Sequence, residues 1–218
     1  MNQGELHRYF LNNSHKLIHK WAHYFDIYER HLARFVNTSP TLLEIGVYQG
    51  GSLAMWKSFL GQGCQIAGID INPDCIQHQA EGIDVFTGSQ DDPEIINDVL
   101  KKYPQIDIVI DDGSHLMSHM IDTFNMLYHR ISPYGVYIVE DVHTCYWPEY
   151  GGGLKRNTSF MEFAKDKIDE LNALHTRGAS PVSDFTRETD YITFYDSMVV
   201  FERRPQAQRQ DIKTQGMP

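Results

Sequence analysis

The sequence predicts an α/β protein built on a doubly wound, Rossmann-like sheet that is mostly parallel and closes with a C-terminal antiparallel strand. Short apolar stretches alternate with helix-like stretches from residue 41 to residue 139, which is typical of βαβ units. The last two apolar stretches, residues 191–195 and 198–202, are separated only by Asp196 and Ser197. Because a parallel crossover needs about a dozen residues or more, this pair is expected to form an antiparallel hairpin.

The individual elements follow from hydrophobic periodicity and from turn residues. Strands are expected at residues 41–46, 65–71, 83–87, 106–110 and 135–139, and helices at 52–60, 92–103 and 117–130. Residues 14–37 carry apolar side chains at three- and four-residue steps, from Leu17 to Phe35, which predicts an amphipathic helix. We therefore expect a single domain over residues 1–203, with this helix at its N-terminus, and a polar tail at 204–218.

Length and charge narrow the class of protein. The chain has 218 residues, enough for one well-filled core, and a formal net charge of −10. An excess of acid disfavours nucleic acid as a partner, so a small-molecule substrate is expected. No apolar run approaches the roughly 20 residues that cross a bilayer, and the first residues are too polar for a secretory signal, which predicts a cytoplasmic protein with no membrane partner. Three cysteines without metal-ligand spacing are expected to be reduced.

Three successive strand ends carry residues suited to a nucleotide-like cofactor. The first is the turn Glu44–Ser52, where Gly46 and Gly50 let the backbone approach a ligand and the following helix offers free N–H groups. An acid such as Glu44 suits the cationic amino acid moiety of S-adenosylmethionine better than the pyrophosphate of NAD. Asp70, followed by Ile71, ends the second strand where an acid can accept the ribose hydroxyls, and Ser89 and Gln90 lie in a polar turn expected to face adenine.

Two further strands end in acid clusters. Asp112 follows the strand at 106–110, and Glu140 and Asp141 follow the strand at 135–139. Carboxylates at neighbouring strand tips suit a hard divalent cation, and His115, three residues after Asp112, can accept a proton near neutral pH. The alternatives are helix capping for the first cluster and solvated strand ends for the second. Zinc bound by His115 and His119 is disfavoured, because no Glu follows the first His as in metalloproteases.

The segment after the second acid cluster contains candidate substrate contacts. His143, Tyr146 and Trp147 follow closely, and aromatic rings can stack on the apolar face of a sugar. The run Gly151–Gly153 is interpreted either as a mobile lid over the acceptor or as an ordinary flexible loop.

Four stretches carry a family resemblance: Lys20–Tyr24, Leu43–Ser52, Asp111–His115 and Val139–Asp141. The chain resembles class I S-adenosylmethionine-dependent methyltransferases. More narrowly, it resembles the catalytic domain of the metal-dependent sugar O-methyltransferases of macrolide biosynthesis, the mycinamicin VI 2''-O-methyltransferase type. Tyr48, where the general motif has its middle glycine, and Ser89, where an Asp often stands, depart from the pattern, as does the absence of the additional N-terminal domain.

The resemblance implies S-adenosyl-L-methionine and Mg²⁺ as cofactors and a sugar-bearing small molecule as the substrate. It implies a metal site of Asp112, Glu140 and Asp141 with His115 as the general base, and it adds to the cofactor-binding residues Lys20, Tyr48, Ser52 and Asp111. Two other hypotheses remain open at this stage: methylation of a catechol-like diol, and a non-catalytic binding protein on the same scaffold. The aromatic residues within 14–37 also predict a homo-oligomer.

Overall fold

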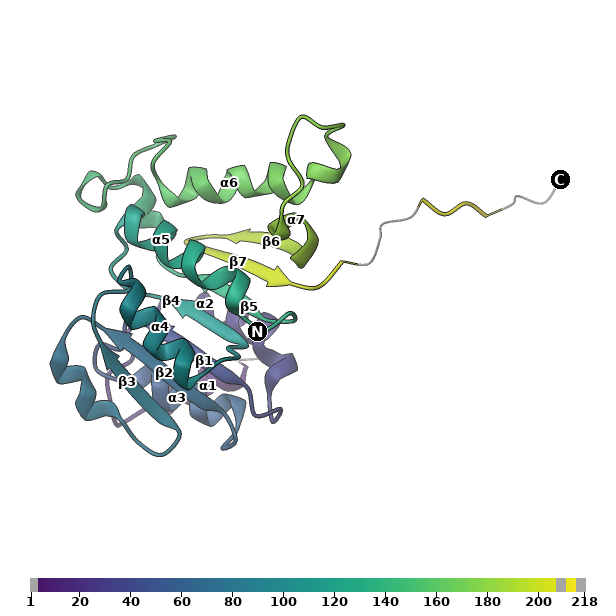
Figure 1. The fold of residues 1–218 in the computed structure, drawn as a ribbon. Helices are drawn as coiled ribbons and strands as arrows, with labels where there is room; N and C mark the ends of the chain where they lie inside the picture. Colours follow the sequence, from purple (N-terminus) through teal and green to yellow (C-terminus); the bar gives the residue numbers. More distant parts are fainter. Residues whose placement is uncertain (1–3, 207–210, 215–218) are drawn as a thin grey trace.

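A computed structural model describes residues 4–206 and 211–214 and contains one seven-stranded sheet, in the order β3-β2-β1-β4-β5-β7-β6 (Figure 1). The strands are β1 Thr41–Ile45, β2 Gln65–Asp70, β3 Ile83–Thr87, β4 Ile108–Asp111, β5 Val136–Val139, β6 Thr189–Tyr195 and β7 Met198–Arg203. The first five pair in parallel, whereas β7 runs antiparallel to both β5 and β6. This arrangement is the class I methyltransferase fold and confirms the predicted fold class.

Helices cover both faces of the sheet (Figure 1). They are α1 Glu5–Asn12, α2 Tyr24–Leu32, α3 Gly51–Leu60, α4 Pro93–Lys102, α5 Met117–Leu127, α6 Phe160–Leu171 and α7 Asp184–Glu188. Alternate strand residues enter two separate cores, one formed with α1, α2 and α3 and the other with α4 to α7. Because both faces are buried, the central strands are apolar at nearly every position, and polar residues appear only where the strands end.

The N-terminal region differs from the predicted helix at 14–37. That prediction was wrong for residues 14–23, which are irregular together with Asn13, and a short 3-10 turn at Ala33–Phe35 follows α2. Side-chain hydrogen bonds at the end of α1 compete with helix formation there: the Asn13 amide donates to the carbonyl of Lys16, and Asn13 Oδ1 accepts from the His15 N–H. We call residues 13–23 the N-terminal strap.

The same region bears on the predicted oligomer. Tyr24 and Tyr28 are buried in the core, and Trp21 is the aromatic side chain of this stretch that stays exposed. The aromatic surface that motivated the oligomer is thus mostly internal, and the oligomeric state stays a prediction. Among the described residues, no helix combines the length and apolar character needed to span a bilayer.

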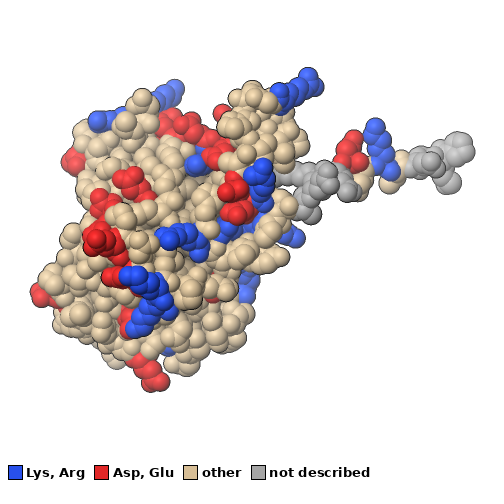
Figure 2. All heavy atoms as spheres, in the orientation of Figure 1, with Lys and Arg blue, Asp and Glu red and all other residues tan. Residues whose placement is uncertain are grey.

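The C-terminal part adds elements that the sequence analysis did not assign. Helix α6 begins after Ser159, whose hydroxyl accepts from the Glu162 N–H, and it covers the end of the sheet formed by β6 and β7 (Figure 1). Of the predicted polar tail, Arg204 and Gln206 bond through their N–H groups to carbonyls at the end of α7. Residues 207–210 and 215–218 lie outside the described residues. On the face shown in Figure 2, basic and acidic side chains are interspersed.

Candidate active site

The sheet brings the two acid clusters to one edge. Strand β4 lies between β1 and β5, so the carboxyl ends of these three parallel strands are neighbours. Backbone bonds continue past the strands: the Asp112 N–H donates to the Ile45 carbonyl at 3.0 Å, and the Glu140 N–H donates to the Asp111 carbonyl at 2.9 Å. The acids following β4 and β5 are therefore held at fixed positions rather than on free loops.

Asp112, His115 and Asp141 form a compact group. His115 Nε2 lies 3.9 Å from Asp112 Oδ1 and 3.8 Å from Asp141 Oδ2, and one ligand atom from each residue lies within 4.8 Å of the other two. His115 and Asp141 both have left-handed backbone angles, with φ of 58° and 52°. Such angles are costly for residues other than glycine and persist where the surroundings impose them, often at functional sites.

Lys20 of the N-terminal strap lies behind this group, with its side chain only 3% exposed. Its Nζ atom is 2.6 Å from Asp112 Oδ2, 2.9 Å from Glu140 Oε2 and 4.0 Å from Glu44 Oε1. Burial alone would lower the pKa of Lys20, but the three carboxylates together raise it above its usual value, so the ammonium stays charged.

Glu140 takes a different place from the one predicted for a metal ligand. Its carboxylate is engaged by Lys20 and lies outside the group of Asp112, His115 and Asp141. Burial, followed by repulsion from Asp112, raises the pKa of Glu140 to about 8, although Lys20 opposes the shift. Its Oε1 atom has no hydrogen-bond partner among the described residues, and the buried Tyr28 hydroxyl, also unpartnered there, is near enough to lower that pKa. A ligand role for Glu140 stays a prediction.

The predicted cofactor turn and the acid group open into one cavity of about 410 Å³. Its lining includes Gly46, Tyr48, Ser52 and Asp70 from the cofactor side, and Lys20, Asp112, His115 and Asp141 from the acid side. Asp70 Oδ2 accepts the Val47 and Tyr48 N–H groups, each at 2.9 Å, so this carboxylate shapes the turn as well as facing the cavity. Gly50, with φ of 68°, ends the turn, and a Cβ there would collide with the His78 ring.

A smaller cavity of about 170 Å³ adjoins the ends of β2, β3 and β4. Ile71, which is 72% exposed, lines it together with Ser89 and Gln90, and their contact with an adenine ring stays a prediction. The Gln90 amide is already engaged: its nitrogen donates to Asp111 Oδ1 at 3.0 Å and its oxygen accepts the Ser114 N–H at 2.7 Å. Gln90 therefore ties the β3 turn to the β4 turn.

Two predicted cofactor residues, Glu44 and Asp111, are buried beneath the cavities and are absent from their linings. Glu44 accepts hydrogen bonds from the Ser52 hydroxyl at 2.8 Å and the Trp56 indole at 3.0 Å. Burial raises the pKa of Asp111 to about 7, against the hydrogen bond from Gln90. These contacts indicate that Glu44 and Asp111 shape the pocket from below. Direct contact of either acid with a cofactor stays a prediction.

A third cavity, of about 250 Å³, lies on the other side of the acid group. Trp21, Tyr24 and His143 line it together with Asp112, Glu140 and Asp141. The His143 ring lies edge-on to two indoles, 5.9 Å from Trp21 and 4.8 Å from Trp147. Tyr146 is exposed but lines none of these three cavities. The three rings form an aromatic wall beside the acids, made by Trp21, His143 and Trp147.

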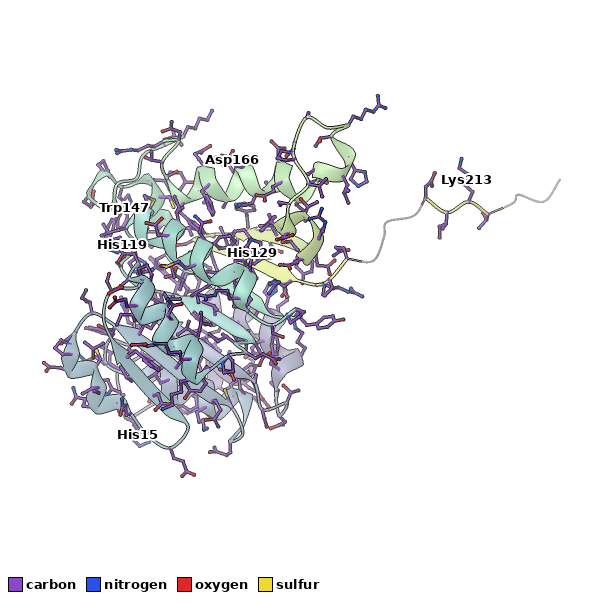
Figure 3. All side chains as sticks on the ribbon, viewed as in Figure 1. His15, His119, His129, Trp147, Asp166 and Lys213 are labelled. Atoms are coloured by element: carbon purple, nitrogen blue, oxygen red, sulfur yellow. The ribbon has the colours of Figure 1, made fainter. Side chains whose placement is uncertain are left out.

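Two contributions to the site were missed from the sequence. The N-terminal strap supplies Leu17, Ile18 and His19 to the large cavity beside the predicted Lys20, because it is irregular and not helical. His119 lines the small cavity, 3.1 Å from the Ser114 hydroxyl and 3.4 Å from Asp91. Figure 3 shows His119 and Trp147 on the side of the molecule where the parallel strands end. The four-residue spacing of His115 and His119 is the sequence signal that could have placed His119 near the site, although it was interpreted only as a zinc motif.

Comparison with curated proteins identifies sugar O-methyltransferases. The chain is 34% identical over 197 residues to the 8-demethyl-8-alpha-L-rhamnosyl tetracenomycin-C 2'-O-methyltransferase of Streptomyces olivaceus, a match covering 85% of this chain and 52% of that protein. It is 37% identical over 171 residues to the demethylmacrocin O-methyltransferase of Streptomyces fradiae, covering 72% and 43%. It is 40% identical over 132 residues to the mycinamicin VI 2''-O-methyltransferase of Micromonospora griseorubida, covering 57% and 33%. The chain thus spans about half the length, or less, of these relatives.

Solved structures give the same relationship. The MycE methyltransferase of the mycinamycin biosynthetic pathway, in complex with Mg, SAH and mycinamycin VI, superposes with a TM-score of 0.79 at 29% identity, covering 94% of this chain and 54% of that chain. A caffeoyl-CoA O-methyltransferase-like structure from Staphylococcus aureus, at 17% identity and a TM-score of 0.52, shares the fold alone. No protein-family model matches the chain. The family resemblance predicted from the sequence is confirmed.

Proposed function

Because the chain is a class I methyltransferase related to the sugar O-methyltransferases of glycosylated natural products, we propose that it transfers a methyl group from S-adenosylmethionine to a sugar hydroxyl of a glycosylated small molecule. The observation that carries the proposal is the large cavity, in which the cofactor turn and the acid group face the same space. A sulfonium bound at Gly46 and Asp70 would lie beside the group that activates the acceptor. In-line transfer requires that proximity.

The donor atoms fit a divalent cation such as Mg²⁺. Asp112 Oδ1 and Asp141 Oδ2 both face His115, and two carboxylates with open positions for water and substrate oxygens are the ligands that hard cations prefer. We propose Asp112, Glu140 and Asp141 as the holding residues, with Glu140 also serving as a counter-charge of Lys20. When bound, the cation orients neighbouring acceptor oxygens and lowers the pKa of the one to be methylated.

His115 is proposed as the general base. Its Nε2 atom faces the two carboxylates, whose charges stabilise the imidazolium formed when it accepts the acceptor's proton. The acceptor oxygen then forms a bond to the methyl carbon as the carbon–sulfur bond breaks, leaving S-adenosylhomocysteine and the protonated His115. Tyr150 lies edge-on to His115 with ring centres 6.2 Å apart, which restricts the orientation of the imidazole.

The aromatic wall supports a sugar as the acceptor. Trp21, His143 and Trp147 offer ring surfaces beside the acid group, and a pyranose can stack its C–H face on such rings while its hydroxyls reach the acids. Both features lie around the third cavity, which therefore suits a ring that carries neighbouring hydroxyl groups. The catechol hypothesis shares the chelating oxygens, so only a substrate panel separates the two.

Calorimetry and a turnover assay test the proposal together. Binding of S-adenosylhomocysteine but not NAD is expected, with a 14 Da mass gain on deoxysugar glycosides that EDTA or Asp112→Ala abolishes without loss of cofactor affinity. Methylation of catechols in preference to glycosides would shift the assignment to diols. NAD binding without sulfonium binding would refute the cofactor, and tight cofactor binding with no methylated product would leave a non-catalytic binding protein.

A further inference from the structure

The Tyr24 hydroxyl contacts Asp141 twice, which no other side chain in the described site does. It donates to Asp141 Oδ1 at 2.7 Å and accepts the Asp141 backbone N–H at 3.1 Å. One side-chain atom thus holds both the carboxylate and the main chain of the same residue. Tyr24 is the first residue of α2, directly after the N-terminal strap, and it is separated from Asp141 by 117 positions.

The backbone contact explains how Asp141 keeps a left-handed conformation. With φ of 52°, Asp141 lies in a region costly for a residue with a Cβ atom, so its surroundings must hold it there. Ser197, in the β6–β7 turn, also borders the Tyr24 hydroxyl: the Ser197 hydroxyl, 2.9 Å away, can donate to it, whereas the Ser197 carbonyl, 2.8 Å away, competes with Asp141 Oδ1 for its single proton. The left-handed turn aims the Asp141 side chain at His115.

The carboxylate contact leaves one oxygen free. Tyr24 engages Oδ1 of Asp141, and Oδ2 is the oxygen that faces His115 at 3.8 Å. Lys20 makes the equivalent contact to Asp112. Its ammonium donates to Oδ2 at 2.6 Å, and Oδ1 is the oxygen that faces His115. Both carboxylates are therefore tethered by one oxygen to the N-terminal region and present the other to the same space.

We infer that Tyr24 is a positioning residue for the cation site: its hydroxyl sets the backbone and carboxylate of Asp141 so that Oδ2 is aimed before a cation binds. The inference rests on the proposed function, in which Asp141 is one of the holding residues. Donors behind a ligand orient it, and their loss typically weakens metal affinity about 10- to 100-fold. Lys20 shares this geometry, but its substitution also changes the local charge, so Tyr24 offers the cleaner test.

The test compares Tyr24→Phe with Tyr28→Phe. Both tyrosines lie on α2 one turn apart, are fully buried and pack edge-on to each other, but the Tyr28 hydroxyl lies near Glu140 and makes no hydrogen bond to Asp141. Mn²⁺ binding, followed by electron paramagnetic resonance on the whole 218-residue chain, should weaken at least tenfold in Tyr24→Phe and stay within twofold of wild type in Tyr28→Phe. With glycoside substrate, the Mg²⁺ concentration for half-activation should rise in Tyr24→Phe, with kcat at saturating Mg²⁺ largely kept.

The stoichiometry of S-adenosylhomocysteine binding, measured by calorimetry, reports the folded fraction of each variant, because Tyr24 does not line the large cavity. Equal Mn²⁺ affinity in folded Tyr24→Phe and wild type would overturn the inference and leave the proposed function standing. Equal losses in Tyr24→Phe and Tyr28→Phe would also overturn it, since the effect would then not be specific to the hydroxyl that contacts Asp141. Wild-type protein that binds no Mn²⁺ would refute the cation part of the proposed function and the inference with it.

Discussion

The Lys20 ammonium lies 2.6 Å from Asp112 Oδ2, so a residue of the N-terminal strap reaches directly into the acid group at the end of β4. The same nitrogen contacts the buried Glu140 carboxylate at 2.9 Å. A buried ion pair is expensive to break by removing one partner, because the remaining charge stays in a poorly solvated place. The position of the strap and the stability of the acid group are therefore coupled.

Replacement of Lys20 by methionine is expected to destabilise the fold. It leaves Asp112, Glu140 and the nearby Glu44 without their counter-charge, a change that typically costs about 3–5 kcal/mol when one member of a buried pair is lost. Urea unfolding at pH 7 measures the loss. Lys16→Met is the matched control, since it removes the same charge from the strap, and among the described residues the Lys16 ammonium bonds to His78 and to none of the three acids. Similar stability of the two variants would contradict a structural role for the Lys20 ion pairs.

Asp111 should make stability depend on pH between about 4 and 7. Its pKa is raised to about 7 in the folded protein, mainly by burial, so the folded state holds a proton that the unfolded state has released. The resulting contribution to the free energy of unfolding is present below pH 4 and is lost as the pH rises through 7, by about 4 kcal/mol for a shift of this size. Urea unfolding across this range should show a flatter dependence in Asp111→Asn.

Asp98→Asn is the control for that measurement, because Asp98 is an exposed acid paired with Lys101 on α4. Its pH dependence should match that of the wild type. An Asp111→Asn protein with an unchanged slope between pH 4 and pH 7 would show that other acids cause the dependence.

Removal of His115 should slow the reaction without weakening the cofactor. His115→Ala is expected to lower kcat about 10²- to 10⁴-fold, the usual range for loss of a general base, with S-adenosylhomocysteine affinity nearly unchanged. Initial rates of methyl transfer to a series of glycoside acceptors measure the effect. His129→Ala is the control: His129 pairs with Glu188 and lies well away from His119 and Trp147 in Figure 3. A wild-type rate in His115→Ala would require another base, with Asp111 and His143 the next candidates.

Much of the sheet and of its acidic edge was predictable from the sequence, for a physical reason. The strands β1, β4 and β5 are buried on both faces, so their apolar runs are local signals, and parallel strands bring their carboxyl ends together. Asp112 and Asp141 could therefore be expected to meet before any coordinates were known. The prediction for His115 combined its short distance in sequence from Asp112 with its imidazole side chain, and the family resemblance supplied its role as the base.

The N-terminal strap was not predictable in the same way. Its conformation depends on Lys20 meeting Asp112 and Glu140, which lie 92 and 120 positions further along the chain. The apolar residues from Leu17 onward have the spacing of an amphipathic helix. Only the run Asn12-Asn13-Ser14 indicates that the chain is not helical there. Helix α6, in contrast, was predictable, because Ser159 followed three residues later by Glu162 is a sequence signature of a helix N-terminus.

The aromatic wall should contribute to acceptor binding more than to the chemical step. Trp21 is 54% exposed and lies 5.9 Å from the His143 ring, beside the cavity that holds the acid group. Trp21→Ala is expected to raise the KM for a glycoside at least tenfold, which corresponds to a loss of about 1.4 kcal/mol, while kcat falls much less. Steady-state kinetics with saturating cofactor measure the two constants.

Tyr134→Ala is the control for this measurement. Tyr134 is also an exposed aromatic residue but lies at the opposite end of β5, so its replacement should leave both constants within twofold. A large fall in kcat with KM unchanged would instead place Trp21 at the reacting atoms, and no change in either constant would remove it from the acceptor site.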